Sequence, residues 1–192
     1  EGVRRESWRR KFSGGSTMAE AEPNAGHLGV LELDRRGKLN AVITQNVDGL
    51  HQKSGIDDGK VIELHGNANY ATCLDCLKRF ELSEIASIFN QNETVPYCDQ
   101  CGGILKTATI SFGQSMPEVP MERSQEAVMS CDLMLAMGSS LPVYPAAAFP
   151  RIAKQNGARL VIINNEPTDL DAVWGLVLHE PGGLALSAAL NI

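Results

Sequence analysis

The chain has 192 residues, which is enough to bury a sizeable core in one domain, or in one domain with a small insertion. Its formal net charge of −6 argues against a dedicated nucleic-acid-binding protein, which usually carries a basic surface. No apolar run approaches the ~20 residues that span a bilayer, and the N-terminal residues lack the apolar core of a signal peptide. We therefore expect a cytoplasmic protein without membrane or direct nucleic-acid partners.

The first third of the chain predicts one helix and two buried strands. Residues 1 to about 26 show no clean periodicity, and the basic cluster RRESWRRK within them is interpreted as a solvated segment. Leucines recur near helical spacing in HLGVLELDRRG, which ends at Gly37, a typical helix stop. The apolar stretches 38–44 and 60–64 are typical of buried strands.

The middle of the chain predicts a short helix and a strand. LSEIASIFNQ would form a helix that starts at a Ser83 cap and buries Ile85, Ile88 and Phe89. TATISF, over residues 107–112, is typical of a strand.

From residue 117 onward, helices and strands alternate. The predicted helices cover 117–131, 145–157 and 182–190, and the predicted strands cover 132–138, 159–165 and 174–180. Pro150 should kink or restart the second of these helices. Continuously apolar strands that alternate with helices indicate an α/β fold, in which helices cover both faces of a parallel sheet.

The cysteines form a metal-binding pattern. Cys73, Cys76, Cys98 and Cys101 give the spacing C-x2-C-x21-C-x2-C, which is typical of a four-thiolate zinc site. Four thiolates leave no open position on a tetrahedral ion, so we expect one structural Zn²⁺. Four free buried thiols and a redox pair are the alternatives. The remaining cysteine, Cys131, is interpreted as a small core residue.

Polar residues follow four of the predicted strands. In an open parallel sheet, ligands bind at the carboxyl ends of the strands, and hydroxyls, amides and carboxylates suit a ribose and a phosphate. Taken singly, a turn explains Gly-Ser-Ser, local side-chain bonds explain Asn-Asn-Glu, and a structural role explains a lone histidine. No G-x-G-x-x-G occurs in the chain. The residues at the four ends are Gln45, Asn46 and Asp48; His65 and Gly66; Gly138, Ser139 and Ser140; and Asn164, Asn165 and Glu166.

Six stretches, in this order and spacing, resemble the sirtuins, the NAD-dependent protein lysine deacylases, and their bacterial type in particular. They are TQNVDGLH, ELHG, the two C-x-x-C knuckles, SFG, GSSLPVYPAA and IINNEPT. The resemblance runs from about residue 20 to the end of the chain. It implies a Rossmann-like domain formed by 1–69 and 108–192, with a small zinc-binding domain over 70–107.

The resemblance also assigns roles. It implies that His65 is the catalytic general base, that NAD is bound, and that an acyl-lysine protein or peptide is the substrate. The substrate peptide would be clamped by strand addition at Phe112 and Gly113 on one side and at Leu141 and Val143 on the other. The implied NAD-binding residues are Gln45, Asn46, Val47, Asp48, Gly138, Ser139, Ser140, Asn164, Asn165, Glu166 and Gly182.

The sequence departs from the sirtuin pattern at its start. The family usually opens with a strand and a glycine-rich loop of the form GAGxS followed by GIPDFRG, and neither occurs in these 192 residues. We expect the molecule to carry this segment. If it does not, the alternative is a non-catalytic, zinc-stabilised interaction module or NAD sensor. A second alternative is a protein ADP-ribosyltransferase that uses the same NAD site.

Overall fold

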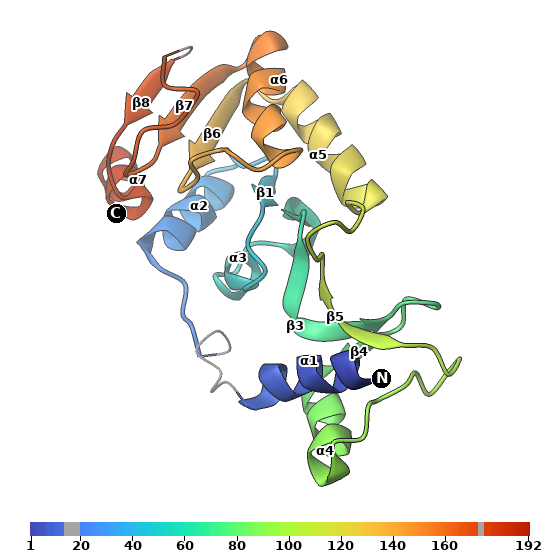
Figure 1. Cartoon of the computed structure of the whole chain (residues 1–192). Coiled ribbons are helices and arrows are strands. Elements are labelled where there is room, and N and C mark those ends of the chain that lie inside the picture. The colour runs from blue at the N-terminus through green and yellow to red at the C-terminus, as the bar shows by residue number, and fades with distance from the viewer. Residues whose placement is uncertain (14–19, 173–174) are drawn as a thin grey trace. The chain divides into compact units, whose positions relative to one another are not determined.

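The computed structural model describes residues 1–13, 20–172 and 175–192, and the chain divides into two compact units (Figure 1). Unit 1 comprises Glu1–Ala21, Asn46–Gly49 and His65–Ser115. Unit 2 comprises Glu22–Gln45, Leu50–Leu64 and Met116–Ile192. The domain boundaries at residues 69 and 107 stay a prediction, since compactness alone does not define a domain.

Unit 2 alternates helices and short parallel strands. β1 pairs in parallel with β2, and β6, β7 and β8 form a second parallel sheet in that order. The predicted α/β fold is thereby confirmed, although no ladder among the described residues joins β1 to β6. Its elements are α2 (Ala25–Arg35), β1 (Val42–Thr44), α3 (Leu50–Lys53), η1 (Asp58–Lys60), β2 (Val61–Glu63), α5 (Glu118–Ser130), β6 (Leu133–Met137), η2 (Ala146–Ala148), α6 (Phe149–Gln155), β7 (Arg159–Ile163), β8 (Leu176–Leu178) and α7 (Gly182–Leu190).

Two helix pairs build the core of unit 2. α5 and α6 pack together, and α6 also contacts β6 and β7, where Ile162 is fully buried. Pro150 lies in the first turn of α6, where a missing N–H costs no hydrogen bond, so the predicted restart is confirmed. α2 and α7 form the second pair and approach closely, because a Cβ at Gly29 would lie only 2.8 Å from Cβ of Leu186.

Unit 1 is built on an antiparallel sheet instead. β3 lies in the middle, between β4 and β5. Neither β3 nor β4 is predicted from the sequence, because β3 carries asparagines and lacks the apolar alternation of a half-buried strand. The elements are α1 (Gly2–Ser13), β3 (Gly66–Cys73), β4 (Arg79–Glu81), α4 (Leu82–Asn92) and β5 (Leu105–Thr109).

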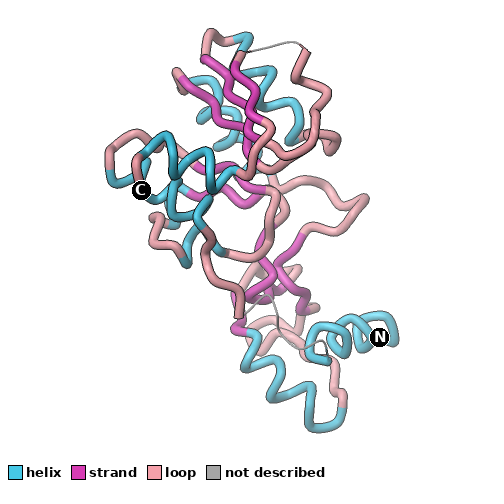
Figure 2. Tube along the Cα trace, turned by 90° about the vertical axis from the view of Figure 1, so that its left-hand side faces the viewer, coloured by secondary structure: helices cyan, strands magenta, loops and turns pink. Residues whose placement is uncertain are grey.

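Helix α1 corrects the expectation that residues 1 to about 26 are irregular. Trp8 stacks on Phe12 with ring centroids 5.6 Å apart, and Phe12 in turn contacts Phe89 of α4. Both views show α1, marked by the N-terminus, beside α4 (Figures 1 and 2). Two aromatic residues four positions apart are too few to predict a helix, yet they suffice to attach one to the core.

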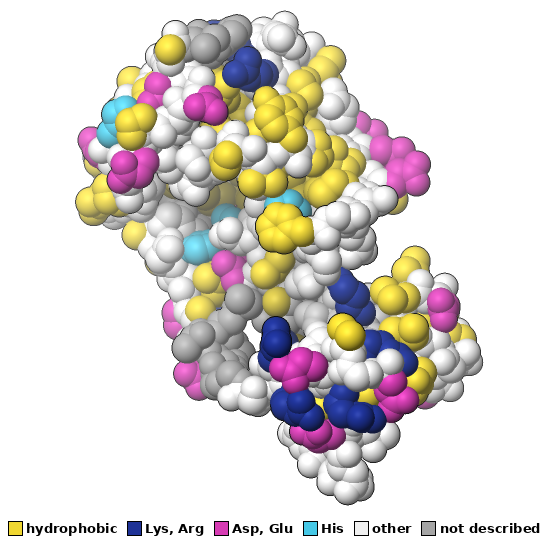
Figure 3. All heavy atoms as spheres, in the orientation of Figure 1, with side chains coloured by type: hydrophobic (Ala, Val, Ile, Leu, Met, Phe, Trp, Pro, Cys, Tyr) yellow, Lys and Arg dark blue, Asp and Glu magenta, His cyan; other side chains and the backbone are white. Residues whose placement is uncertain are grey.

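The basic cluster of α1 is balanced by acids. Glu6 pairs with Arg9 and Arg10 within the helix, and Arg9 also pairs with Glu93 at the end of α4, at 2.5 Å. Figure 3 shows basic and acidic side chains interleaved over this part of the surface. Exposed pairs of this kind at helical spacing contribute little to stability, but they balance the charge of the helix surface. The interpretation of this cluster as a solvated segment agrees with these exposed pairs but is wrong for Trp8, which is buried.

Three further expectations need correction. The N-cap of α4 is Glu81 and not Ser83, which lies inside the helix, and Ile88 is 47% exposed because it faces away from the core. The strand predicted over 107–112 ends at Thr109, since only its first part pairs with β3. β8 is shorter than the predicted 174–180, and Trp174 lies outside the described residues.

No described helix is both long and apolar enough to cross a membrane.

Trp8 is the residue on which the attachment of α1 depends. It is 3% exposed and packs among Ile85, Phe89 and Leu105. Trp8→Ala is expected to lower the free energy of unfolding by about 3–5 kcal/mol, as large-to-small changes in cores do. Val3→Ala, at an 86% exposed position of the same helix, is the matched control and should change it little. Denaturant unfolding followed by circular dichroism measures both, and equal stabilities would contradict this packing.

Candidate functional site

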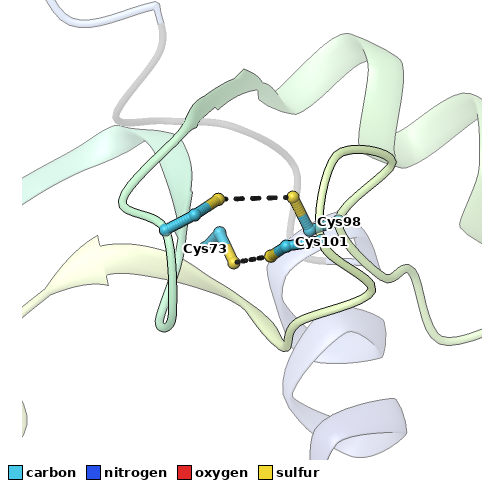
Figure 4. Close-up of side chains that lie close together, drawn as sticks. Cys73, Cys98 and Cys101 are labelled. Atoms are coloured by element: carbon cyan, nitrogen blue, oxygen red, sulfur yellow. Dashed lines mark hydrogen bonds between the residues drawn. The ribbon is translucent and has the colours of Figure 1, made fainter.

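The four predicted metal ligands lie together in unit 1. Cys73 ends β3, Cys76 follows in the next turn, and Cys98 and Cys101 lie in the loop between α4 and β5 (Figure 4). The Sγ atoms of Cys73 and Cys101 are 3.5 Å apart, and those of Cys76 and Cys98 are 3.6 Å apart. All four Sγ atoms lie within 4.8 Å of one another.

This arrangement fits a zinc ion. Zn–S bonds of about 2.3 Å in a tetrahedron place neighbouring sulfurs about 3.8 Å apart, close to the separations seen here. Cys73 and Cys98 are buried in the core of unit 1, next to Ile85 and Leu105. The ion would therefore join both cysteine knuckles to the hydrophobic core, as a structural site does.

The surroundings of the thiols favour metal binding over four free thiols. A hydrogen bond from the backbone of Cys76 lowers the pKa of Cys73 to about 7. At Cys101 a backbone hydrogen bond from Gly103 lowers the pKa. Hydrogen bonds with the neighbouring thiols of Cys73 and Cys76 act in the opposite direction and, together with burial, outweigh it, so the pKa of Cys101 is raised to about 12. Thiols this close cannot all ionise unless a cation compensates their charge. We therefore read the cluster as a site for one divalent ion.

The candidate catalytic residue, His65, stands at the start of the antiparallel sheet. It follows the fully buried Leu64, is itself half-buried, and precedes β3. Its carbonyl oxygen accepts a hydrogen bond from the Ile110 N–H at 2.9 Å. The next residue, Gly66, pairs with Thr109 of β5. The backbone on both sides of the histidine ring is therefore fixed.

Gly66 is required at this position. Its φ is +72°, and a Cβ here would collide with the carbonyl oxygen of Ala108. Gly66→Ala is expected to cost at least about 1–3 kcal/mol for the backbone conformation alone, with the collision added. Gly113→Ala is the matched control, because Gly113 has a φ of +81° with nothing within 4 Å of a Cβ. If thermal unfolding shows the two variants equally stable, the close contact at Gly66 is not real.

The segment 46–49 belongs to the same unit as His65. Asn46 is exposed, whereas Val47 and Asp48 are half-buried. The carbonyl of Val47 accepts a hydrogen bond from the Ala68 N–H at 2.8 Å, three residues after the histidine. The structure thus brings Asn46, Val47 and Asp48 to the strand that begins next to His65. Gln45 ends the preceding segment, which belongs to unit 2.

In unit 2, the predicted strand ends lie side by side. Gly138 follows β6, and its N–H donates to the carbonyl of Ile163, the last residue of β7, at 2.9 Å. Asn164 follows β7, and its N–H donates to the carbonyl of Leu178, the last residue of β8, at 3.1 Å. Gly138 has a φ of +62° and open space where a Cβ would stand, so its backbone is accessible.

The other predicted residues of unit 2 surround this edge. Gly182 begins α7, and a Cβ there would lie 2.9 Å from the terminal methyl of Met137, the last residue of β6. The Ser139 hydroxyl accepts from the Leu141 N–H at 3.1 Å, and the Asn164 amide donates to the Glu166 carbonyl at 2.7 Å. Ser140, Asn165 and Glu166 are exposed.

The predicted substrate-binding residues do not lie in strands of this structure, and binding of a peptide by strand addition stays a prediction. Phe112 and Gly113 lie in a turn after β5, and Leu141 and Val143 lie in the loop after β6. No neighbouring strand pairs with either segment among the described residues. The Phe112 side chain is fully exposed, whereas Leu141 is 9% exposed and packs in the core of unit 2. The Leu141 side chain is therefore part of the core, and its N–H donates to the Ser139 hydroxyl.

Sequence reasoning missed Asn67 and Asn69. Asn67 is 7% exposed, and the Asn69 side chain donates to the carbonyl of Asp48 at 2.7 Å. The two asparagines are visible directly after His-Gly, but no strand is predicted there, so their spacing alone does not indicate these contacts.

Comparisons with known proteins agree with the resemblance. The family model described as the Sir2 family matches residues 3–145. An NAD-dependent protein deacetylase of Rhodopseudomonas palustris is 48% identical over 184 residues, which are 96% of this chain and 73% of that protein. NAD-dependent protein deacetylase 2 of Streptomyces coelicolor is 43% identical over 98% of this chain and 78% of its own length.

Solved structures described as Sir2 are also similar to this chain. One described as Sir2 bound to acetylated peptide superposes with a TM-score of 0.90 and 32% identity, covering 99% of this chain and 79% of that chain. Another, described as Sir2-p53 peptide-NAD+, has a TM-score of 0.88 at 32% identity and covers 99% of this chain and 78% of that chain.

Proposed function

Because this chain belongs to the Sir2 family, the sirtuins, we propose that it is an NAD-dependent protein lysine deacylase and acts as a deacetylase. With the consumption of NAD and one water, it transfers the acyl group of a modified lysine to ADP-ribose, so its products are free lysine, nicotinamide and O-acyl-ADP-ribose. One observation within unit 1 supports this activity most directly. The segment with Asn46 and Asp48 is hydrogen-bonded to the strand that begins next to His65.

His65 acts as the general base. NAD, when bound, supplies the ADP-ribose that accepts the acyl group. The reaction requires a proton to leave a ribose hydroxyl, and it requires no nucleophile from the protein. An imidazole suits this step, because its ordinary pKa lies near working pH. Asn46 and Asp48 position the nicotinamide carboxamide and its ribose, with Gln45 and Val47 beside them.

The edge of unit 2 binds the adenosine half of NAD. Backbone N–H groups after β6 and the hydroxyls of Ser139 and Ser140 suit a ribose and a phosphate. Asn164, Asn165 and Glu166 contact the adenosine end, and Gly182 allows the backbone to approach the adenine. The zinc ion holds the cysteine knuckles together and takes no part in the chemistry.

The acyl-lysine substrate binds by strand addition. Unit 1 contributes Gly113 and the exposed Phe112, and unit 2 contributes the loop with Leu141 and Val143. Neither segment pairs with a strand among the described residues, although the Leu141 N–H donates to Ser139 and the Val143 carbonyl accepts from Ala147, so a peptide would have to replace those bonds. The protein acts in the cytoplasm, where its cysteines stay reduced and able to bind metal.

The full-length protein, incubated with an acetyl-lysine peptide, tests the proposal by mass spectrometry. Deacetylation should proceed with NAD and stop when NAD is omitted. Transfer of labelled ADP-ribose to protein without loss of acetyl would instead identify an ADP-ribosyltransferase. Absence of NAD binding in calorimetry would identify a non-catalytic module.

A further inference from the structure

We propose that Asn67 and Asn69 are positioning residues, which hold the segment 46–49 against the strand that begins beside His65. We call residues 67–69 with this segment the asparagine clamp. The catalytic consequence rests on the proposed function, because that function assigns work to Asp48 and His65. The clamp itself rests only on contacts within unit 1.

Two hydrogen bonds and one close packing contact join the two halves of the clamp. The Ala68 N–H donates to the Val47 carbonyl at 2.8 Å, and the Asn69 side-chain amide donates to the Asp48 carbonyl at 2.7 Å. A Cβ at Gly49 would lie 2.7 Å from Nδ2 of Asn69 and 3.3 Å from Nδ2 of Asn67. Three successive residues of the segment are therefore in contact with three successive residues of the strand.

A β-bulge makes these contacts possible. β3 pairs with β5 at Gly66 and again at Ala71, so four residues of β3 face the single residue Ala108. The bulge removes residues 67–69 from the ladder with β5, and their backbone and side chains turn to another partner. The Ala68 N–H is thus free to bond Val47 instead of a strand.

Asn67 sets the geometry of the bulge. It is 7% exposed, and its side-chain oxygen accepts the N–H of Asn69 at 2.8 Å. This is an Asx turn, in which a side chain replaces a backbone acceptor and fixes the chain two residues on. It orients Asn69 so that the amide of that residue reaches Asp48.

The far side of the bulge is also held. The carbonyl of Ala68 accepts a hydrogen bond from the Lys11 ammonium at 2.8 Å. Ala68 is therefore bonded to α1 through its carbonyl and to the segment 46–49 through its N–H. A bulge fixed from both sides is rigid, which is what holding Asp48 at a set distance from His65 requires.

Asn69→Asp tests the clamp. The change keeps the shape of the side chain but replaces the donor that faces the Asp48 carbonyl with a carboxylate oxygen. Loss of one such bond should lower kcat for deacetylation about 10-fold, while KM for the peptide changes less than about threefold. The matched control is Asn90→Asp, at an exposed position of α4, which should keep full activity.

Asn67 provides a second pair of variants. Asn67→Leu keeps the volume and removes the acceptor, so kcat should fall as in Asn69→Asp. Asn67→Ser keeps a side-chain oxygen that can accept from the N–H two residues on, and should retain most of the activity. If Asn67→Ser keeps its activity while Asn67→Leu loses it, the side-chain acceptor of the Asx turn is required, and not only the volume of the side chain.

Amide hydrogen exchange on the same full-length variants separates positioning from general stability and needs no activity. The clamp predicts faster exchange at 46–49 and 68–69 only. Unchanged exchange there, or faster exchange throughout β3–β5 with a lower melting temperature, would overturn it. Unchanged kcat in both Asn69→Asp and Asn67→Leu would overturn it as well. If the wild-type protein shows no NAD-dependent deacetylation, the proposed function fails, and hydrogen exchange still decides the clamp.

Discussion

Replacing Cys98 with serine is expected to unfold unit 1 and to release its zinc. Cys98 is 4% exposed and lies in the same core cluster as Trp8, Phe89 and Leu105. Binding of a structural zinc ion contributes on the order of 10 kcal/mol at neutral pH, as much as the whole stability of a typical domain. Losing one ligand therefore removes more free energy than this small core can replace.

Elemental analysis and circular dichroism measure this outcome. The wild-type protein should contain one zinc per chain, and Cys98→Ser should contain much less and lose ordered structure. Cys131→Ser is the matched control, because Cys131 belongs to unit 2 and not to the cluster. A wild-type protein without metal, or a Cys98→Ser variant that keeps a full equivalent of zinc, would refute the assignment.

Replacing His65 with alanine should abolish nicotinamide release from NAD and an acetyl-lysine peptide. General-base catalysis contributes about 10²–10⁴-fold to a rate, so the residual activity should fall near or below detection. NAD should still bind, because the other proposed contacts to it come from backbone and side chains outside His65. Calorimetry of the variant with NAD provides this control.

A second variant, His65→Gln, separates proton transfer from simple hydrogen bonding. Glutamine keeps polar atoms near the ring position but cannot take a proton at working pH. Both variants should therefore be inactive. Turnover near the wild-type level in His65→Ala would contradict the mechanism, and recovery in His65→Gln would reduce the role of His65 to a polar contact.

The parallel part of the fold could be predicted because its signals are local. Apolar strands alternate with helices after residue 117, and β6 and β7 lie within the predicted stretches 132–138 and 159–165. Unit 1 could not be predicted in the same way. Its sheet pairs β3 with β4 and β5, and its core gathers Trp8 and Phe89, which are far apart in sequence.

In the candidate site, too, the features set by local sequence could be predicted and those set by long-range pairing could not. The cysteine spacing predicts four ligands because each knuckle is local, and the polar strand ends follow from strand position alone. The asparagine clamp escapes such reasoning, because Asn69 bonds a backbone carbonyl of a residue 21 positions away. The bulge that aims it depends on the pairing of β3 with β5, which no short stretch of sequence specifies.

The central claim is that acyl removal consumes NAD in a fixed ratio. The most direct measurement is the amount of each product formed by the full-length protein from an acetyl-lysine peptide and NAD. We predict one nicotinamide and one O-acetyl-ADP-ribose for each lysine deacetylated. Free acetate in place of O-acetyl-ADP-ribose, with no nicotinamide released, would contradict it.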